Sequence, residues 1–128
     1  MRIFIVEDSI EVRERLSDML QSISGIELVG EADNENDAVR SIRNVQPDVV
    51  IVDFSLAIRN NQNVIRRIKM QSPATRVIVL SNNVYPQYRR KCMDLGADFF
   101  MDKSRDIGDL GRLLIELDEQ RSAPAKAI

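Results

Sequence analysis

The chain has 128 residues, of which 44% are hydrophobic and 30% are charged, which is typical of one folded domain with a single core. A net charge of −2 predicts no general attraction to nucleic acid, and apolar runs of only a few residues exclude a membrane-spanning helix. The absence of histidine excludes His-based catalysis and the usual zinc sites, and a single cysteine, Cys92, excludes an intrachain disulfide. We therefore expect a cytoplasmic protein that binds neither a membrane nor nucleic acid directly.

Strands and helices alternate along the chain. Short apolar runs predict strands over residues 2–6, 26–32, 49–52, 76–81 and 97–101. Apolar residues at helical spacing predict helices over residues 12–23, 35–45, 61–70 and 86–95, and a last helix after a capping residue, Ser104. We expect Tyr88, Cys92 and Leu95 to face inward on the fourth helix, which ends at Gly96. Ile107, Leu110, Leu114 and Leu117 form the apolar stripe of the last helix.

Five strand-helix pairs joined by short connections predict an α/β fold with a parallel sheet covered on both faces, because parallel strands need crossover connections. The third strand, VVIV, has no polar residue at alternate positions, which is typical of a strand buried on both faces. We expect residues 1–121 to form one domain and residues 122–128 to form a flexible tail.

Polar side chains follow the predicted strands where each of them ends. In open α/β sheets this edge binds ligands. The residues expected there are Glu7 and Asp8, Asp53, Ser81 with Asn82 and Asn83, and Lys103. Crowded carboxylates repel one another unless a cation joins them, and a set of oxygen ligands favours Mg²⁺. Taken one at a time, these residues could equally be helix caps, surface charges or core residues.

A site of this kind is suited to a small dianionic phosphoryl group. Mg²⁺ and Lys103 would neutralise the phosphoryl oxygens, and Asp53 would be placed in line as the nucleophile. We find no general base, nucleotide-binding loop or sugar pocket in the sequence.

Four motifs, VEDS, VVIVDFSL, VIVLSN and GADFFMDKS, resemble those of response-regulator receiver domains in their order and spacing. The resemblance implies a doubly wound, flavodoxin-like (βα)₅ fold with strand order 2-1-3-4-5. It implies that Asp53 accepts a phosphoryl group from the phosphohistidine of a sensor histidine kinase or phosphotransfer protein. It also assigns Mg²⁺ to Asp8, Asp53 and the backbone carbonyl of Ser55, with Glu7 acting largely through water.

The same resemblance assigns roles in switching and in access to the site. Ser81 and Lys103 would contact the phosphoryl oxygens, and Phe100 stands where the family places its aromatic switch residue. Phosphorylation would draw the Ser81 hydroxyl inward and let Phe100 fill the space that it vacates. Asn82 would narrow the mouth of the site, and Asn83 and the Ser55 side chain stand where the family tunes hydrolysis.

Several positions depart from the family pattern. Ala57 and Ser104 stand where a proline is common, Asn61 stands where a glycine is common, and Phe100 stands where a tyrosine is frequent. Asparagine can still adopt the left-handed conformation that glycine would supply.

The chain is expected to signal by contact with a downstream protein and to catalyse only its own phosphorylation and dephosphorylation. The contact face would comprise the fourth helix, with its basic YRRK segment, the fifth strand and the fifth helix. No DNA-binding module is expected beyond the last helix.

Three other functions stay open. The first is an aspartate-nucleophile phosphatase, which needs a second acid at the position that Ser55 occupies. The second is a flavodoxin-like cofactor binder, which needs a phosphate-binding loop after the first strand, where the acidic VEDSIE segment would repel phosphate. The third is a protein-interaction module of the same fold that is never phosphorylated.

Overall fold

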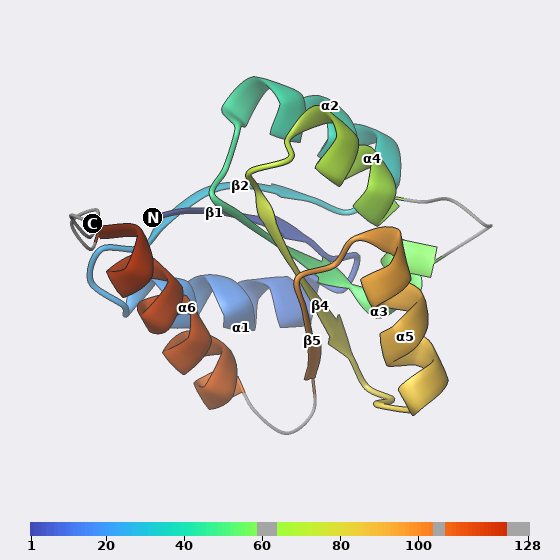
Figure 1. The fold of residues 1–128 in the computed structure, drawn as a ribbon. Helices are drawn as coiled ribbons and strands as arrows, with labels where there is room; N and C mark the ends of the chain where they lie inside the picture. Colours follow the sequence, from blue (N-terminus) through green and yellow to red (C-terminus); the bar gives the residue numbers. More distant parts are fainter. Residues whose placement is uncertain (59–63, 104–106, 123–128) are drawn as a thin grey trace, which may run out of the picture.

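The computed structural model describes residues 1–58, 64–103 and 107–122. Its five strands form one parallel sheet in the order β2-β1-β3-β4-β5, which confirms the predicted fold and strand order (Figure 1). The strands are β1 (Arg2–Val6), β2 (Glu27–Ala32), β3 (Val49–Asp53), β4 (Arg76–Ser81) and β5 (Phe99–Asp102).

Helices cover both faces of the sheet. They are α1 (Ile10–Gln21), α2 (Glu35–Val45), α3 (Phe54–Ile58), α4 (Val64–Gln71), α5 (Pro86–Leu95) and α6 (Ile107–Ser122). Helices α1 and α6 pack on one face, and α2, α3, α4 and α5 pack on the other, so the strands separate two hydrophobic cores (Figure 1). In the described part of the chain, no helix has both the length and the apolar character that crossing a membrane requires.

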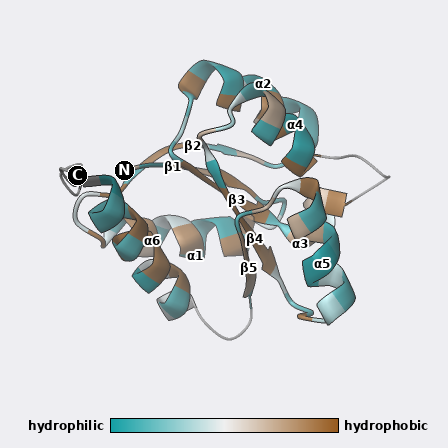
Figure 2. Ribbon diagram, viewed as in Figure 1, coloured by the Kyte–Doolittle hydropathy of each residue, from teal (hydrophilic) through white to brown (hydrophobic). Residues whose placement is uncertain are grey.

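Strand β3 lies in the middle of the sheet, between β1 and β4. All five of its residues are buried, including the terminal Asp53. Figure 2 shows that hydrophobic residues are concentrated on the strands, whereas the helices carry hydrophilic residues as well. Burial on both faces explains why the VVIV run has no alternating polar positions.

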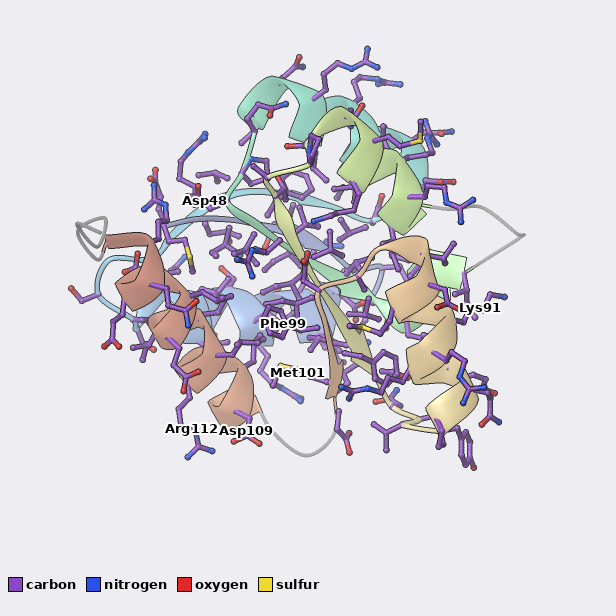
Figure 3. All side chains as sticks on the ribbon, in the orientation of Figure 1. Asp48, Lys91, Phe99, Met101, Asp109 and Arg112 are labelled. Atoms are coloured by element: carbon purple, nitrogen blue, oxygen red, sulfur yellow. The ribbon has the colours of Figure 1, made fainter. Side chains whose placement is uncertain are left out.

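Helix α6 closes the core beneath the edge strand β5. Leu110, Leu114 and Leu117 are buried there, as predicted. Phe99 and Met101 of β5 pack on the same side, and Figure 3 shows both side chains in the region between β5 and α6.

Helix α5 also agrees with the prediction. Pro86 occupies its first turn, and Gly96 ends it with a positive φ of 112°. Cys92 is fully buried, and Tyr88 and Leu95 pack against the same core.

The segment after Asp53 differs from the prediction. The sequence indicated one helix over residues 61–70, but a short helix, α3, begins directly at Phe54 and α4 follows at Val64. The buried side chains of Leu56 and Ala57 hold α3 on the core, although five residues are too few to show a helical period.

Three further predictions concern residues outside the described ranges. They are the conformation of Asn61, the helix cap at Ser104 and the flexible tail of residues 122–128, of which only Ser122 is described. The described part of α6 continues to Ser122.

Gly30 of β2 is required by the aromatic ring that covers it. It pairs with Phe4 of β1, and a Cβ at Gly30 would lie 2.7 Å from Cε2 of this buried ring. We predict that Gly30→Ala lowers the free energy of unfolding, measured by urea denaturation, by about 1–3 kcal/mol. Gly108→Ala in α6 is the matched control, because nothing lies within 4 Å of its added Cβ, and it should stabilise by up to about 1 kcal/mol. Equal stability of the two variants would contradict this prediction.

Candidate functional site

The register of the sheet brings the predicted residues together at one edge. Val6 of β1 pairs with Val52 of β3, so the next residues, Glu7 and Asp53, emerge side by side. At the other side of β4, the backbone N–H of Lys103 donates to the Ser81 carbonyl at 2.8 Å. Residues from four strand ends, those of β1, β3, β4 and β5, therefore meet above the carboxyl edge of the sheet.

The ammonium group of Lys103 joins two of these carboxylates. Its Nζ donates to Glu7 Oε1 at 2.7 Å and to Asp53 Oδ1 at 2.8 Å. Glu7 is 2% exposed and Asp53 9% exposed, and the Lys103 side chain is 14% exposed. Because the three groups are largely shielded from water, their attraction is weakly screened.

Burial and mutual contacts shift the pKa values of Glu7 and Lys103. Burial raises the pKa of Glu7 above its usual range, and the charge of Asp53 raises it further, against the lowering effect of the Lys103 hydrogen bond. Burial alone would lower the pKa of Lys103, but its hydrogen bonds to Asp53 and Glu7 outweigh burial and raise it. Lys103 therefore stays charged at neutral pH, and Glu7 takes up a proton more readily than an ordinary glutamate.

The donor set fits a hard divalent cation. Glu7, Asp8 and Asp53 each offer a carboxylate oxygen, and these oxygens all lie within 4.8 Å of one another. Glu7 Oε2 is buried and has no hydrogen-bond partner among the described residues. Lys103 contacts two of these carboxylates, Glu7 and Asp53, and oxygen ligands of this kind are those that Mg²⁺ uses in proteins.

Ser55 contacts Asp53 through its side chain. The Ser55 hydroxyl, in the first turn of α3, donates to Asp53 Oδ2. Both oxygens of Asp53 are thus hydrogen-bonded, one to Lys103 and the other to Ser55. The sequence assigned the Ser55 backbone carbonyl to Mg²⁺ and its side chain to the tuning of hydrolysis, and it did not predict this hydrogen bond to Asp53.

The Ser81 hydroxyl is occupied within its own loop. It donates to the Asn83 carbonyl at 2.6 Å and accepts from the Asn83 N–H at 3.1 Å. The side chains of Asn82 and Asn83 are exposed beside it. In this conformation Ser81 is therefore held by Asn83, and an inward movement toward Asp53 stays a prediction about a second state.

Phe100 already lies in the interior. It is 8% exposed, and its ring meets Phe54 edge-on, with ring centroids 6.1 Å apart. A phenylalanine has no hydroxyl that would favour the surface, so apolar burial is sufficient to hold it inside.

Arg13 is a site residue that the sequence reasoning missed. Its guanidinium donates from α1 to the backbone carbonyl of Glu7 at 2.9 Å. The only signal in the sequence is an arginine in the first turn of the helix that follows the acidic pair.

The comparisons with known proteins agree with this geometry. The family described as "Response regulator receiver domain" matches residues 3–114. A structure of a LuxR-family two-component response regulator from Aurantimonas superposes with a TM-score of 0.84, at 26% identity, and covers 98% of this chain and 89% of that one.

Two curated relatives are longer than this chain. A protein-glutamate methylesterase/protein-glutamine glutaminase of Syntrophomonas wolfei is 34% identical over 104 residues, which are 80% of this chain and 29% of that protein. The transcriptional regulatory protein YvfU of Bacillus subtilis, described as uncharacterized, is 28% identical over 110 residues, or 86% of this chain and 55% of that protein. The family match, the sheet topology and the cluster at its edge show that this chain belongs to the response regulator receiver domains of two-component signalling.

Proposed function

We propose that Asp53 accepts a phosphoryl group from the phosphohistidine of a sensor histidine kinase or phosphotransfer protein, with the help of Mg²⁺. The observation that supports this most strongly is the position of Asp53, at the end of a buried strand with Lys103 on one side and Glu7 and Asp8 beside it. The chemistry is directed at the chain itself: transfer to Asp53, followed by hydrolysis from it.

Asp8, Asp53 and the backbone carbonyl of Ser55 would hold Mg²⁺, with Glu7 acting through water. When bound, the cation supplies positive charge that neutralises the phosphoryl oxygens. A carboxylate oxygen of Asp53 attacks phosphorus, the new P–O bond forms as the P–N bond to histidine breaks, and the electron pair of that bond returns to the imidazole.

Lys103 changes partners during this step. In the structure its ammonium group is shared between Glu7 and Asp53. Once the Asp53 carboxylate has become an acyl phosphate, the charge lies on the phosphoryl oxygens, and Lys103 follows it. The Ser81 hydroxyl gives up its bond to Asn83 and donates to the same group.

Aromatic side chains link this event to the surface. Phe54, which follows Asp53 directly, contacts both Phe100 and Tyr88, with centroids 6.1 and 4.9 Å apart, respectively. Tyr88 in turn meets the exposed Tyr85 edge-on at 5.5 Å. A shift of α3 at Asp53 would therefore reach the start of α5 through packed rings.

The downstream protein would bind the face formed by α5, β5 and α6. Helix α5 exposes Arg89, Arg90 and Lys91, and Figure 3 shows Lys91 projecting from α5 away from the sheet. Phosphorylation shifts the population between two conformations of this face.

Incubation with phosphoramidate, followed by intact-mass measurement, tests the proposed function. We expect one added phosphoryl group in the presence of Mg²⁺, little without it, and none in Asp53→Asn. Asp18→Asn, which changes an exposed acid on α1, is the matched control and should be modified like the wild type. Modification that persists in Asp53→Asn, or that does not depend on Mg²⁺, would show that the proposal is wrong.

The two acids at the end of β1 should differ in their effect on Mg²⁺ binding. Glu7→Gln removes a carboxylate that acts on Mg²⁺ through water, so we expect the Mg²⁺ dissociation constant from calorimetry to rise roughly ten- to hundredfold. Asp8→Ala removes a direct Mg²⁺ ligand, so its dissociation constant should rise further. An equal loss of Mg²⁺ affinity in the two variants would contradict this division of roles.

Lys103→Met should leave a folded protein that no longer changes conformation on phosphorylation. Without Mg²⁺ it leaves the buried carboxylates of Glu7 and Asp53 without the ammonium group that they share, and we expect a loss of about 3 kcal/mol in the free energy of unfolding. The folded variant should still bind Mg²⁺, but NMR shifts of α5 amides on phosphorylation should disappear. Lys91→Met, an exposed change on α5, should retain both stability and shifts. Shifts of normal size in Lys103→Met would argue against its role in switching.

A further inference from the structure

Arg13 connects the loop that carries the acidic pair to two elements of the fold. Its guanidinium Nη1 donates to the Glu7 carbonyl at 2.9 Å, and its Nε lies 4.0 Å from Glu31 Oε2 near the end of β2. The side chain is 22% exposed, so it lies largely along the protein surface and does not extend into solvent. Neither contact is required by the helix in which Arg13 sits.

The Arg13 contact completes a set of backbone anchors around Glu7 and Asp8. The Glu7 N–H donates to the Ala32 carbonyl at 2.9 Å, and the Glu7 carbonyl accepts from Arg13. Beyond Asp8, the Ser9 hydroxyl accepts from the Val12 N–H at 3.3 Å and caps α1. Asp8 therefore lies between two fixed points, and Arg13 supplies one of the hydrogen bonds at the first.

We infer that Arg13 is a positioning residue for the divalent cation: by holding the Glu7 carbonyl, it fixes the peptide from which the Asp8 carboxylate extends. This inference rests on the proposed function, because it assumes that Glu7, Asp8 and Asp53 form a cation site. Outer groups that orient metal ligands commonly change metal affinity without touching the metal.

Electrostatics alone predicts the opposite sign. Arg13 carries a positive charge near a site for a cation, so a role through charge would make its removal strengthen Mg²⁺ binding. Positioning predicts that its removal weakens Mg²⁺ binding, because Asp8 must then be ordered by the metal itself. The sign of the change therefore distinguishes the two roles.

Arg13→Met is the test variant, because methionine keeps much of the aliphatic stem and removes both the charge and the donor. Arg15→Met is the matched control: it makes the same change on the same helix, at an exposed position. Mg²⁺ affinity is measured by calorimetry, and the free energy of unfolding is measured without Mg²⁺. We expect the dissociation constant to rise roughly tenfold in Arg13→Met and to stay at or slightly below the wild-type value in Arg15→Met.

Arg13→Lys provides a second arm that retains the charge and one flexible donor. We expect it to bind Mg²⁺ more tightly than Arg13→Met and more weakly than the wild type, because an ammonium group lacks the planar fork of arginine. The comparison of Arg13→Lys with the wild type and with Arg15→Met holds even if Arg13→Met does not fold.

Each outcome has one meaning for the inference. The positioning role would be overturned if Arg13→Met bound Mg²⁺ as tightly as the wild type or more tightly. It would also be overturned if Arg13→Lys and Arg15→Met lost Mg²⁺ affinity to the same extent. A wild-type chain that does not bind Mg²⁺ would instead overturn the cation site of the proposed function, so the two failures are distinguishable.

Discussion

One ammonium group holds the carboxyl edge of this sheet together. Glu7 follows β1, Asp53 ends β3 and Lys103 follows β5, so the contacts of Lys103 connect three strands that are separated by most of the sequence. The buried carboxylates of Glu7 and Asp53 have oxygens within 4.8 Å of each other and would repel each other strongly in a medium of low dielectric constant. The attraction to Lys103 offsets that repulsion, and the site therefore exists only when the strands are in register.

The same arrangement makes the site sensitive to added charge. Asp53 has Lys103 on one oxygen and Ser55 on the other, while Ser81 is held by Asn83. Under the proposed function, each of these bonds would be exchanged when a phosphoryl group arrives, and each exchange would move a group on a different strand end or loop. A local change in charge would then become a change in packing that the aromatic contacts of α3 could pass on.

Sequence reasoning succeeded where local patterns determine the structure. The VVIV run predicts β3 because continuous β-branched residues suit a strand buried on both faces, and Gly96 predicts the end of α5 because it tolerates a positive φ. Together with the short connections, these patterns placed Asp53, Ser81 and Lys103 at one edge, which the structure confirms as a location. Their chemical roles stay predictions.

The features that the sequence did not predict depend on tertiary contacts, which leave no local pattern in the sequence. Helix α3 is too short for a periodic signal and is held by burial of Leu56 and Ala57. The direction of the Ser81 hydroxyl depends on where the Asn83 carbonyl lies. Arg13 contacts the backbone of a loop, and a backbone carbonyl gives no sign in the sequence of what will bind it.

A crystal structure of the chain with Mg²⁺ and the phosphoryl mimic beryllium fluoride would show whether Asp53 is the phosphoryl acceptor. We expect Mg²⁺ among Glu7, Asp8 and Asp53, and beryllium fluoride bound to Asp53. Lys103 Nζ should have left Asp53 Oδ1 and should contact a fluorine atom. Beryllium fluoride bound to another residue would contradict the proposed role of Asp53. A Lys103 that still contacts Asp53 Oδ1 when beryllium fluoride is bound would contradict the proposed exchange of partners.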